Sequence, residues 1–393
     1  MKAGWKKKPL GELCDVIGGG TPPKDRPDYY GGIIPWATVR DMRADIITST
    51  EHSITSEAVK VSATNIIPAG NVVIATRVGL GKVCLLAQDT AVNQDLRGIV
   101  PKSNKEIDIA FLFAWFKSIS EQIIAEGTGA TVQGVKLPFI KGLSVPLPTM
   151  EEQRRIVTLL DEAFADIATA KANAEKNLQN TRSVFERNLL SVLNDKKWKW
   201  STLGDLCTSV EYGSSAKSKA ENGIPVLRMG NIQDGRLDWK NLVFTDDQEE
   251  IQKYLLKQND VLFNRTNSPE LVGKTAIYKS EMPAIFAGYL IRIHRKDDLL
   301  DGDFLTYFLN SQIALDYGKT VVISSVNQAN INGTKLKSYP IPAPSLTEQK
   351  TIVKKLDELA QETHRLETIY RQKITVLDDL KKSLLHQAFS GQL

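Results

Sequence analysis

A phrase of seventeen residues occurs twice in this chain, and it constrains the fold more than any other feature. PLPTMEEQRRIVTLLDE begins at Pro146 and PAPSLTEQKTIVKKLDE begins at Pro342, and nine of the seventeen positions are identical. The similarity extends to the start of each copy, because WKKKPLGELC at Trp5 matches WKWSTLGDLC at Trp198. A chain of 393 residues is also too long to fold around one ordinary hydrophobic core, so two or more domains are expected. The sequence therefore predicts two copies of one unit of roughly 195 residues.

Each copy begins with a predicted mixed domain, over 1–148 and 196–345. Short apolar segments such as NVVIATRV and RGIVP in the first copy, and DVLFNRT and YLIRIH in the second, alternate with Gly, Pro and Asn turns. One helix interrupts the strands in each copy, around 107–120 and near 304–311. Because helices and strands do not alternate regularly, the pattern indicates an α+β fold. Trp36, Trp115 and Trp239 are expected in the cores.

A proline-rich stop and then a long helix end each copy. The residues from 149 to 194 and from 346 to 390 contain no Gly or Pro, which predicts long helices over 149–195 and 346–393. Thr149 and Thr347 are the expected N-caps. Apolar side chains recur at a spacing of three and four on both helices: Ile156, Leu160, Ala163, Ile167, Ala170, Ala174, Leu178, Phe185, Leu189 and Val192, then Ile352, Leu356, Leu359, Leu366, Tyr370, Leu377, Leu380 and Leu384.

These two apolar stripes predict an antiparallel coiled coil within the chain. It would separate the two mixed domains and relate them by a pseudo-two-fold axis. The alternative is that each helix packs on its own domain. Two diverged domains on a helical rod could bind two separated stretches of DNA, but a scaffold that links two proteins could use the same geometry.

Composition excludes several classes of protein. Apolar residues make up 42% and charged residues 24% of the chain, as in globular proteins, and no run of about 18 apolar residues predicts a membrane span. The start of the sequence has lysines without an apolar stretch, which argues against a signal peptide. Three widely spaced cysteines favour a reducing cytoplasm. A net charge of +4 points only weakly to a polyanionic partner.

The sequence offers no catalytic constellation. RVGLGKV and LVGKT lack the frame of a phosphate-binding loop and are better explained as tight turns. No Asn-Pro-Pro-Tyr or Asp-Pro-Pro-Tyr segment marks an amino-methyltransferase loop, and the four histidines lack metal-ligand spacing. We therefore expect recognition and assembly, with no catalysis, cofactor or metal in this chain. A restriction enzyme in its own right is disfavoured for the same reason.

The order of domain, Pro-Pro…Glu-Gln…Ile…Leu-Asp-Glu helix, second domain and a second helix ending SLLHQAFSGQL at 383–393 resembles the specificity subunit of Type I restriction-modification enzymes. The resemblance covers the whole chain. It implies a non-catalytic subunit with two target recognition domains, one for each half of an asymmetric bipartite DNA target. The implied partners are double-stranded DNA, two methyltransferase subunits and restriction or translocase subunits. S-adenosylmethionine would be bound by the methyltransferase.

Candidate DNA contacts follow from the chemistry of base edges and phosphates. Arg or Lys pairs with guanine and Asn or Gln with adenine, whereas Lys, Ser and Thr mostly hold phosphates. The first domain offers three clusters in predicted loops: Thr21 and Lys24; Arg40, Arg43 and Arg77; and Thr128, Thr131, Gln133 and Lys136. The second offers a loop rich in amides and hydroxyls, with Ser324, Asn327, Gln328, Asn330 and Asn332, and further Lys217, Lys219, Arg228, Asn231, Asn264, Arg265 and Asn267.

Structural alternatives exist for some of these residues. Arg40 or Arg43 could instead form a surface ion pair with Asp41 or Asp45, and FNRTNS could be a capped turn. A scaffold that bridges two proteins without reading DNA remains the second hypothesis for the whole chain.

Overall fold

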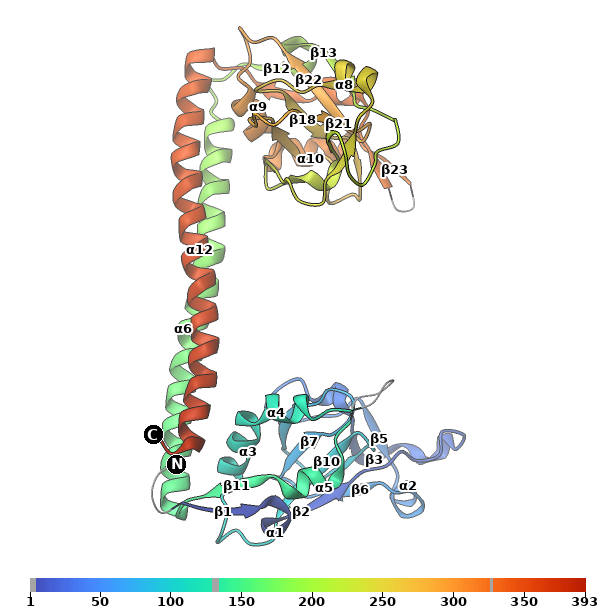
Figure 1. Ribbon diagram of the computed structural model, residues 1–393, viewed down its shortest axis with the longest axis vertical. Coiled ribbons are helices and arrows are strands. Elements are labelled where there is room, and N and C mark those ends of the chain that lie inside the picture. The colour runs from blue at the N-terminus through green and yellow to red at the C-terminus, as the bar shows by residue number, and fades with distance from the viewer. Residues whose placement is uncertain (1–4, 129–133, 326–327) are drawn as a thin grey trace. The chain divides into compact units, whose positions relative to one another are not determined.

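A computed structural model describes residues 5–128, 134–325 and 328–393. The chain divides into two compact units, Met1–Ala174 with Gln372–Leu393, and Glu175–Arg371. Each unit holds one mixed domain and a stretch of both long helices (Figure 1). The long helices are α6 (Met150–Leu193) and α12 (Leu346–Ser390). The division between the units therefore cuts through both long helices.

The first domain combines short strands with short helices. Its strands are β1 (Lys6–Pro9), β2 (Cys14–Gly18), β3 (Tyr30–Ala37), β4 (Ile46–Ile47), β5 (His52–Ile54), β6 (Asn65–Ile67), β7 (Val72–Ala75), β8 (Val83–Leu86), β9 (Thr90–Val92), β10 (Leu96–Pro101) and β11 (Ser144–Leu147). Its helices are α1 (Leu10–Leu13), α2 (Ser56–Val61), α3 (Ile109–Ser118), α4 (Ser120–Ala125) and α5 (Leu137–Gly142). The described strands form the sheets β1-β11, β2-β10-β7-β8-β4 and β5-β3-β9-β6.

Both faces of the sheet that contains β7 are covered. On one face, Ile74 packs with Phe111 of α3 in a core that also includes residues of α4 and α6. On the other face, Val73 packs with Ala37 of the neighbouring sheet. All four residues of β7 are buried as a result, which explains why this segment reads as a continuous apolar run instead of alternating.

The second domain repeats this plan with shorter sheets. Its strands are β12 (Trp200–Thr202), β13 (Cys207–Tyr212), β14 (Ile224–Leu227), β15 (Ile232–Gln233), β16 (Arg236–Leu237), β17 (Val243–Thr245), β18 (Val261–Asn264), β19 (Thr266–Asn267), β20 (Thr275–Ile277), β21 (Ile285–Phe286), β22 (Leu290–Arg295), β23 (Ile323–Ser325), β24 (Gln328–Asn330) and β25 (Pro340–Pro342). Its helices are α7 (Leu203–Leu206), α8 (Gln248–Tyr254), α9 (Gly302–Leu309), α10 (Gln312–Val321) and α11 (Gly333–Lys337). The described strands form the sheets β12-β25, β13-β22-β18-β20, β17-β14-β21, β15-β16 and β19-β24-β23.

The internal repeat and the α+β class are confirmed element by element. In each domain the first strand pairs antiparallel with the strand before the long helix, β1 with β11 and β12 with β25. The central strand orders β2-β10-β7-β8 and β13-β22-β18-β20 correspond. Trp36 and Trp115 are buried as expected, and Trp239 is partly buried against its core. No described helix has both the length and the apolar character needed to cross a membrane.

The repeated Glu-Gln pair has a structural explanation in its glutamine. Gln153 and Gln349 are fully buried at the start of the long helices. The Gln153 side chain accepts a hydrogen bond from the backbone N–H of Asp108 at 2.8 Å, and it donates to the carbonyls of Glu106 and Pro148. Gln349 makes the equivalent three bonds in the second domain. Each glutamine thus fastens a long helix to its own domain.

The expected N-caps are right in one helix and wrong in the other. The Thr149 hydroxyl accepts a hydrogen bond from the N–H of Glu152, as predicted. In the second copy the cap is Ser345, because its hydroxyl and backbone N–H both bond to the Glu348 carboxylate, and the N–H of Glu348 returns a bond to the hydroxyl. Thr347 lies one residue inside the helix. The reciprocal capping box decides the position.

The two long helices pair antiparallel in both units. Lys171 of α6 binds Asp378 of α12 at 2.7 Å in the first unit, and Arg182 of α6 approaches Glu367 of α12 at 3.2 Å in the second. Residue numbers increase along α6 in the direction in which they decrease along α12, so the two helices are antiparallel. Leu380 does not belong to the buried stripe, because it is 44% exposed.

The alternative that each helix packs on its own domain is also partly correct. The core of the first domain includes Ile156 and Leu160 near the start of α6, and Leu385 and Ala388 near the end of α12. The second core includes the start of α12 and the end of α6 in the same way. Because a domain core is available at both ends of each helix, the helices are held by domain contacts as well as by each other.

Candidate nucleic-acid interface

The glycine-rich segment of the first domain lies beside the loop between β9 and β10. The Gly20 N–H donates to the Val92 carbonyl at 3.1 Å, and the Thr21 hydroxyl donates to the side chain of Gln94. A Cβ on Gly19 would lie 2.1 Å from the Val92 carbonyl oxygen, so only glycine permits this approach. Lys24 is exposed further along the segment. The structure thus adds Gln94 to the neighbourhood of Thr21.

The predicted arginine cluster is exposed and only loosely paired. Arg43 donates from Nε to the carbonyl of Arg40 at 2.9 Å, and Arg77 lies 3.6 Å from Asp95. The suggested ion pairs with Asp41 and Asp45 do not occur among the described residues. Asp41 instead caps a short turn with Thr38, and the Asp45 carboxylate binds Lys117. Among the described residues, most donor groups of these three arginines have no hydrogen-bond partner.

The Gly-Thr-rich loop is described only at its two ends. Thr128 and Gly134 exchange backbone hydrogen bonds at 3.1 and 2.9 Å, and exposed Lys136 precedes α5. Thr131 and Gln133 lie outside the described residues. In the second domain Asn327 also lies outside them. The backbones of Ser324 and Gln328 belong to the β23–β24 hairpin.

Three predicted basic residues of the second domain lie on its surface. Lys219 binds both carboxylate oxygens of Asp246 at 2.7 Å, and this hydrogen bond lowers the pKa of Asp246. Arg228 donates to the carbonyl of Asn241 at 3.1 Å, and Lys217 is exposed. All three are exposed to solvent, and Lys219 would have to leave its ion pair to bind a phosphate.

Four predicted asparagines serve the fold. Asn231 is 3% exposed and donates to the carbonyls of Asp238 and Lys240, and Asn264 is fully buried with a bond to the Leu271 carbonyl. Their burial removes these two from the contacts that we propose. Asn332 caps α11, and the Asn267 side chain accepts from the N–H of Ser268 as in the capped-turn alternative.

Arg265 and Asn330 are brought together by strand pairing. The Arg265 guanidinium donates from Nη2 to the Asn330 side chain at 3.4 Å and from Nη1 to the Gly288 carbonyl at 3.1 Å. It also lies 4.8 Å from the centre of the Tyr212 ring. The Asn330 amide donates to the Thr266 hydroxyl at 2.8 Å. A planar cation held in this way has a fixed orientation.

The sequence predictions missed Arg97. This residue lies within β10, opposite Gly18 of β2, inside a segment that reads as an ordinary strand. Its side chain is half-buried, and its Nε has no acceptor among the described residues. An arginine within an otherwise apolar strand was the only available signal, because the space beside it depends on the strand register.

A different arginine holds the second domain together. Arg292 on β22 is 6% exposed and binds Glu211 at 2.5 Å and Asp260 at 3.1 Å. Burial raises the pKa of Glu211, but hydrogen bonds from Arg292 and His294 outweigh it, and the net shift is downward. This paired and buried network is structural.

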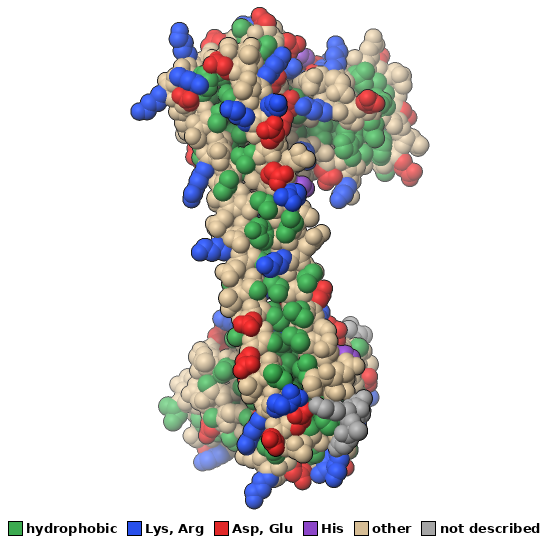
Figure 2. Space-filling view, turned by 90° about the vertical axis from the view of Figure 1, so that its left-hand side faces the viewer, with side chains coloured by type: hydrophobic (Ala, Val, Ile, Leu, Met, Phe, Trp, Pro, Cys, Tyr) green, Lys and Arg blue, Asp and Glu red, His purple; other side chains and the backbone are tan. Residues whose placement is uncertain are grey.

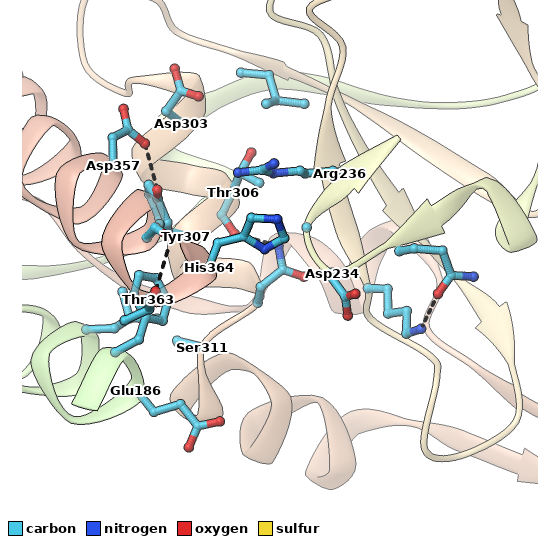
Figure 3. A pocket seen from close by; sticks show the side chains of 18 of the residues that line it. Glu186, Asp234, Arg236, Asp303, Thr306, Tyr307, Ser311, Asp357, Thr363 and His364 are labelled. Carbon is cyan, nitrogen blue, oxygen red and sulfur yellow. Dashed lines mark hydrogen bonds between the residues drawn. The ribbon is translucent and has the colours of Figure 1, made fainter. Parts of the chain in front are cut away.

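A cleft of about 1310 Å³ lies within the second unit, between α9, the β15–β16 hairpin and the two long helices (Figure 3). In it, the Tyr307 hydroxyl donates to Asp357 of α12 at 2.6 Å. Burial and the neighbouring Asp357 raise the pKa of Tyr307, so this hydroxyl stays protonated and links α9 to α12. His364 and Arg236 also face the cleft. In the described part of the chain no group of His, Cys, Asp or Glu could hold a metal ion.

Comparisons with known proteins agree with this architecture. The family model described as the Type I restriction modification DNA specificity domain matches residues 2–178 and again residues 195–376. The MjaIX specificity subunit of Methanocaldococcus jannaschii is 30% identical over 255 residues, and this match covers 59% of each chain. The StySPI specificity subunit of Salmonella potsdam is 25% identical over 422 residues, which cover 100% of this chain and 90% of that protein.

Solved structures share the fold. A chain from a study titled as the structural basis of complex assembly and conformational transition of the type I R-M system has a TM-score of 0.81 at 21% identity, covering 100% of this chain and 99% of that one. The HsdS subunit from Thermoanaerobacter tengcongensis has a TM-score of 0.62 at 20% identity, covering 100% and 98%. Because the family model matches both mixed domains in turn, this chain belongs to the family of Type I restriction-modification DNA specificity subunits.

Proposed function

We propose that this chain is the non-catalytic subunit that gives a Type I restriction-modification system its DNA sequence specificity, with one mixed domain for each half of a bipartite target. The observation that carries the proposal is the double match of a DNA specificity domain to the two structural repeats. The relatives are named specificity subunits, which supports a role in recognition and not in catalysis.

The two half-sites should differ in sequence. The first domain presents Thr21, Gln94 and Arg97 around its glycine-rich segment, whereas the second presents Arg265 and Asn330 at the base of a hairpin. Different donors and acceptors select different base edges. An asymmetric target follows.

The paired helices offer surfaces for the methyltransferase subunits. Unit one exposes Val376 and Leu380 on α12, at 63% and 44%, and unit two exposes Val184 and Ile369, at 47% and 42%. Figure 2 shows apolar side chains gathered over the long helices on the face that it presents. Exposed apolar side chains on a helix favour a protein partner. We assign this surface to two methyltransferase subunits that bind S-adenosylmethionine, with restriction or translocase subunits joining the complex through them.

A methylation map tests the proposal most directly. We would map 6-methyladenine in a host genome by long-read sequencing, with the native methyltransferase gene present and this gene either intact or deleted. Loss of methylation at one bipartite motif on deletion is the expected result, and it would reveal both half-sites. An unchanged map, together with co-purification of two other proteins in a pull-down, would favour a scaffold that does not read DNA.

A further inference from the structure

We propose that Arg97 and Arg265 read guanine, one in each half of the target, from equivalent places in the two domains. The inference rests on the proposed function and adds to it a ligand for each domain, the major-groove edge of a guanine.

Arg97 is a half-buried cation without a partner in the part of the chain that the structure describes. Among the described residues, its guanidinium has no hydrogen bond or ion pair. The side chain lies over Gly18, where a Cβ would come within 2.5 Å of Nη1. Of this group, Nε is buried without an acceptor among the described residues. A buried N–H donor without an acceptor costs free energy, and a bound ligand that supplies one would remove this cost. The glycine preserves the space that the guanidinium occupies.

Arg265 is held in place but keeps unused donors. A guanidinium has five N–H donors, and the bonds to Gly288 and Asn330 use two of them. Its Nε is buried without an acceptor among the described residues. The Tyr212 ring below it fixes the plane of the group.

The strand registers place the two guanidinium groups at corresponding sites. Arg97 pairs with Gly18 across β10 and β2, and the matching pair in the second domain is Ile291 with Tyr212 across β22 and β13. Arg265 in turn corresponds to Thr76. The Thr76 carbonyl accepts from the N–H of Val135, and the Arg265 carbonyl accepts from Ile331, both at 2.9 Å.

The two arginines therefore come from different strands and reach the same end of equivalent sheets. In the first domain β10 supplies the cation and β2 beside it supplies a glycine. In the second domain the neighbouring strand β18 leads into the cation, and a tyrosine fills the place of the glycine. An arginine reaches the corresponding place in each domain, although it comes from a different strand, and this points to a shared ligand.

The geometry favours a guanine edge over a phosphate. The planar fork of arginine fits two acceptors, which either the O6 and N7 of guanine or two phosphate oxygens supply, so burial and orientation distinguish the two ligands. Phosphate contacts are commonly made by exposed, flexible side chains such as Lys24 and Lys217 here. A partly buried and oriented fork loses less freedom on binding and discriminates more strongly.

The experiment uses the full chain in complex with its native methyltransferase. Arg97→Met and Arg265→Met keep an unbranched side chain and remove every N–H donor, whereas lysine could still pair with guanine. Arg26→Met is the matched control, because Arg26 is a surface arginine paired with Asp28. Methylation maps of the three variants are compared with wild type. We expect Arg97→Met to relax one guanine in one half-site and Arg265→Met to relax one guanine in the other, by roughly 5- to 150-fold in discrimination. The control leaves both halves unchanged.

A binding measurement separates a base contact from a phosphate contact. Duplexes carry guanine or 7-deazaguanine, which lacks the N7 acceptor, at the relaxed position. The wild-type complex should bind the deaza duplex more weakly, and Arg97→Met should bind both duplexes equally. Gly18→Ala, which keeps the arginine but crowds its guanidinium, should relax the same guanine.

Unchanged motifs in both methionine variants would overturn the inference, as would a wild-type complex that is insensitive to the deaza substitution. In either case the wild-type bipartite motif would still support the proposed function. A wild-type complex without any bipartite motif would instead remove both proposals.

Discussion

At the scale of single residues, one buried glutamine side chain in each copy has a clear structural role in the repeated seventeen-residue segment. Gln153 and Gln349 lie at the beginning of the long helices, and each accepts a hydrogen bond from a backbone N–H of its domain. The donors are Asp108 and Asp301, which cap α3 and α9. A glutamine amide offers both a donor and an acceptor, and this site needs both. An apolar residue of similar size would remove the partner of three backbone groups, one in a buried and two in part-buried hydrogen bonds.

Replacing this amide should destabilise one unit at a time. Gln153→Met is expected to lower the free energy of unfolding by about 1–3 kcal/mol, because an unsatisfied buried polar group carries its desolvation cost. Calorimetry should show the transition of the first unit shifted down by about 2–4 °C for each kcal/mol. The exposed Gln361 on α12 supplies the control, Gln361→Met, and an equal shift there would refute this role.

At the scale of elements, the long helices show how a cap is chosen. Ser345 and Thr347 are both acceptable N-cap residues by type. Only Ser345 stands three residues before a glutamate that can return the bond, and hydrogen bonds from Ser345 lower the pKa of Glu348. A carboxylate with a lowered pKa stabilises the folded state at pH values above its usual titration range. This stabilisation is lost as the pH falls through the lowered pKa.

The two candidate caps can be distinguished by matched alanine variants. Ser345→Ala should lower the free energy of unfolding of the second unit by about 1 kcal/mol at neutral pH, because it removes the cap. Thr347→Ala lies within the helix and should leave stability unchanged or slightly raised, since alanine has the higher helix propensity. Urea unfolding followed by circular dichroism would compare the two variants. A larger loss for Thr347→Ala would contradict the assignment.

At the scale of the whole molecule, each long helix belongs to both units. The start of one helix and the end of the other complete each domain core, so neither helix can be assigned to a single domain. This sharing leaves apolar side chains such as Val376 and Leu380 on the outside of the pair. A partner subunit is the natural cover for them.

Charged residues at those positions should weaken assembly without unfolding the chain. The double variant Val376→Glu with Leu380→Glu is expected to reduce affinity for the methyltransferase subunit about tenfold or more, because each apolar side chain loses its burial on binding. Ile33 is 92% exposed on the first domain, and Ile33→Glu serves as the control. Sedimentation of the purified mixture would report the complex. Unchanged assembly in the double variant would argue for a different docking surface.

The sequence by itself determined the duplication, the mixed class of the domains, the extent of the long helices and the antiparallel pairing. Each of these depends on patterns that are local or repeated along the chain: Gly and Pro at turns, an apolar spacing of three and four, and one phrase written twice. Only the tertiary structure decided which polar residues are available to a ligand. Asn231 and Asn264 looked like base readers but are buried, whereas Arg97 looked like part of a strand but has no partner among the described residues. The physical reason is that the burial and the hydrogen-bond partners of a side chain depend on contacts between strands that are tens of residues apart in the sequence. No local sequence pattern shows which residue of one strand will lie opposite a given residue of another.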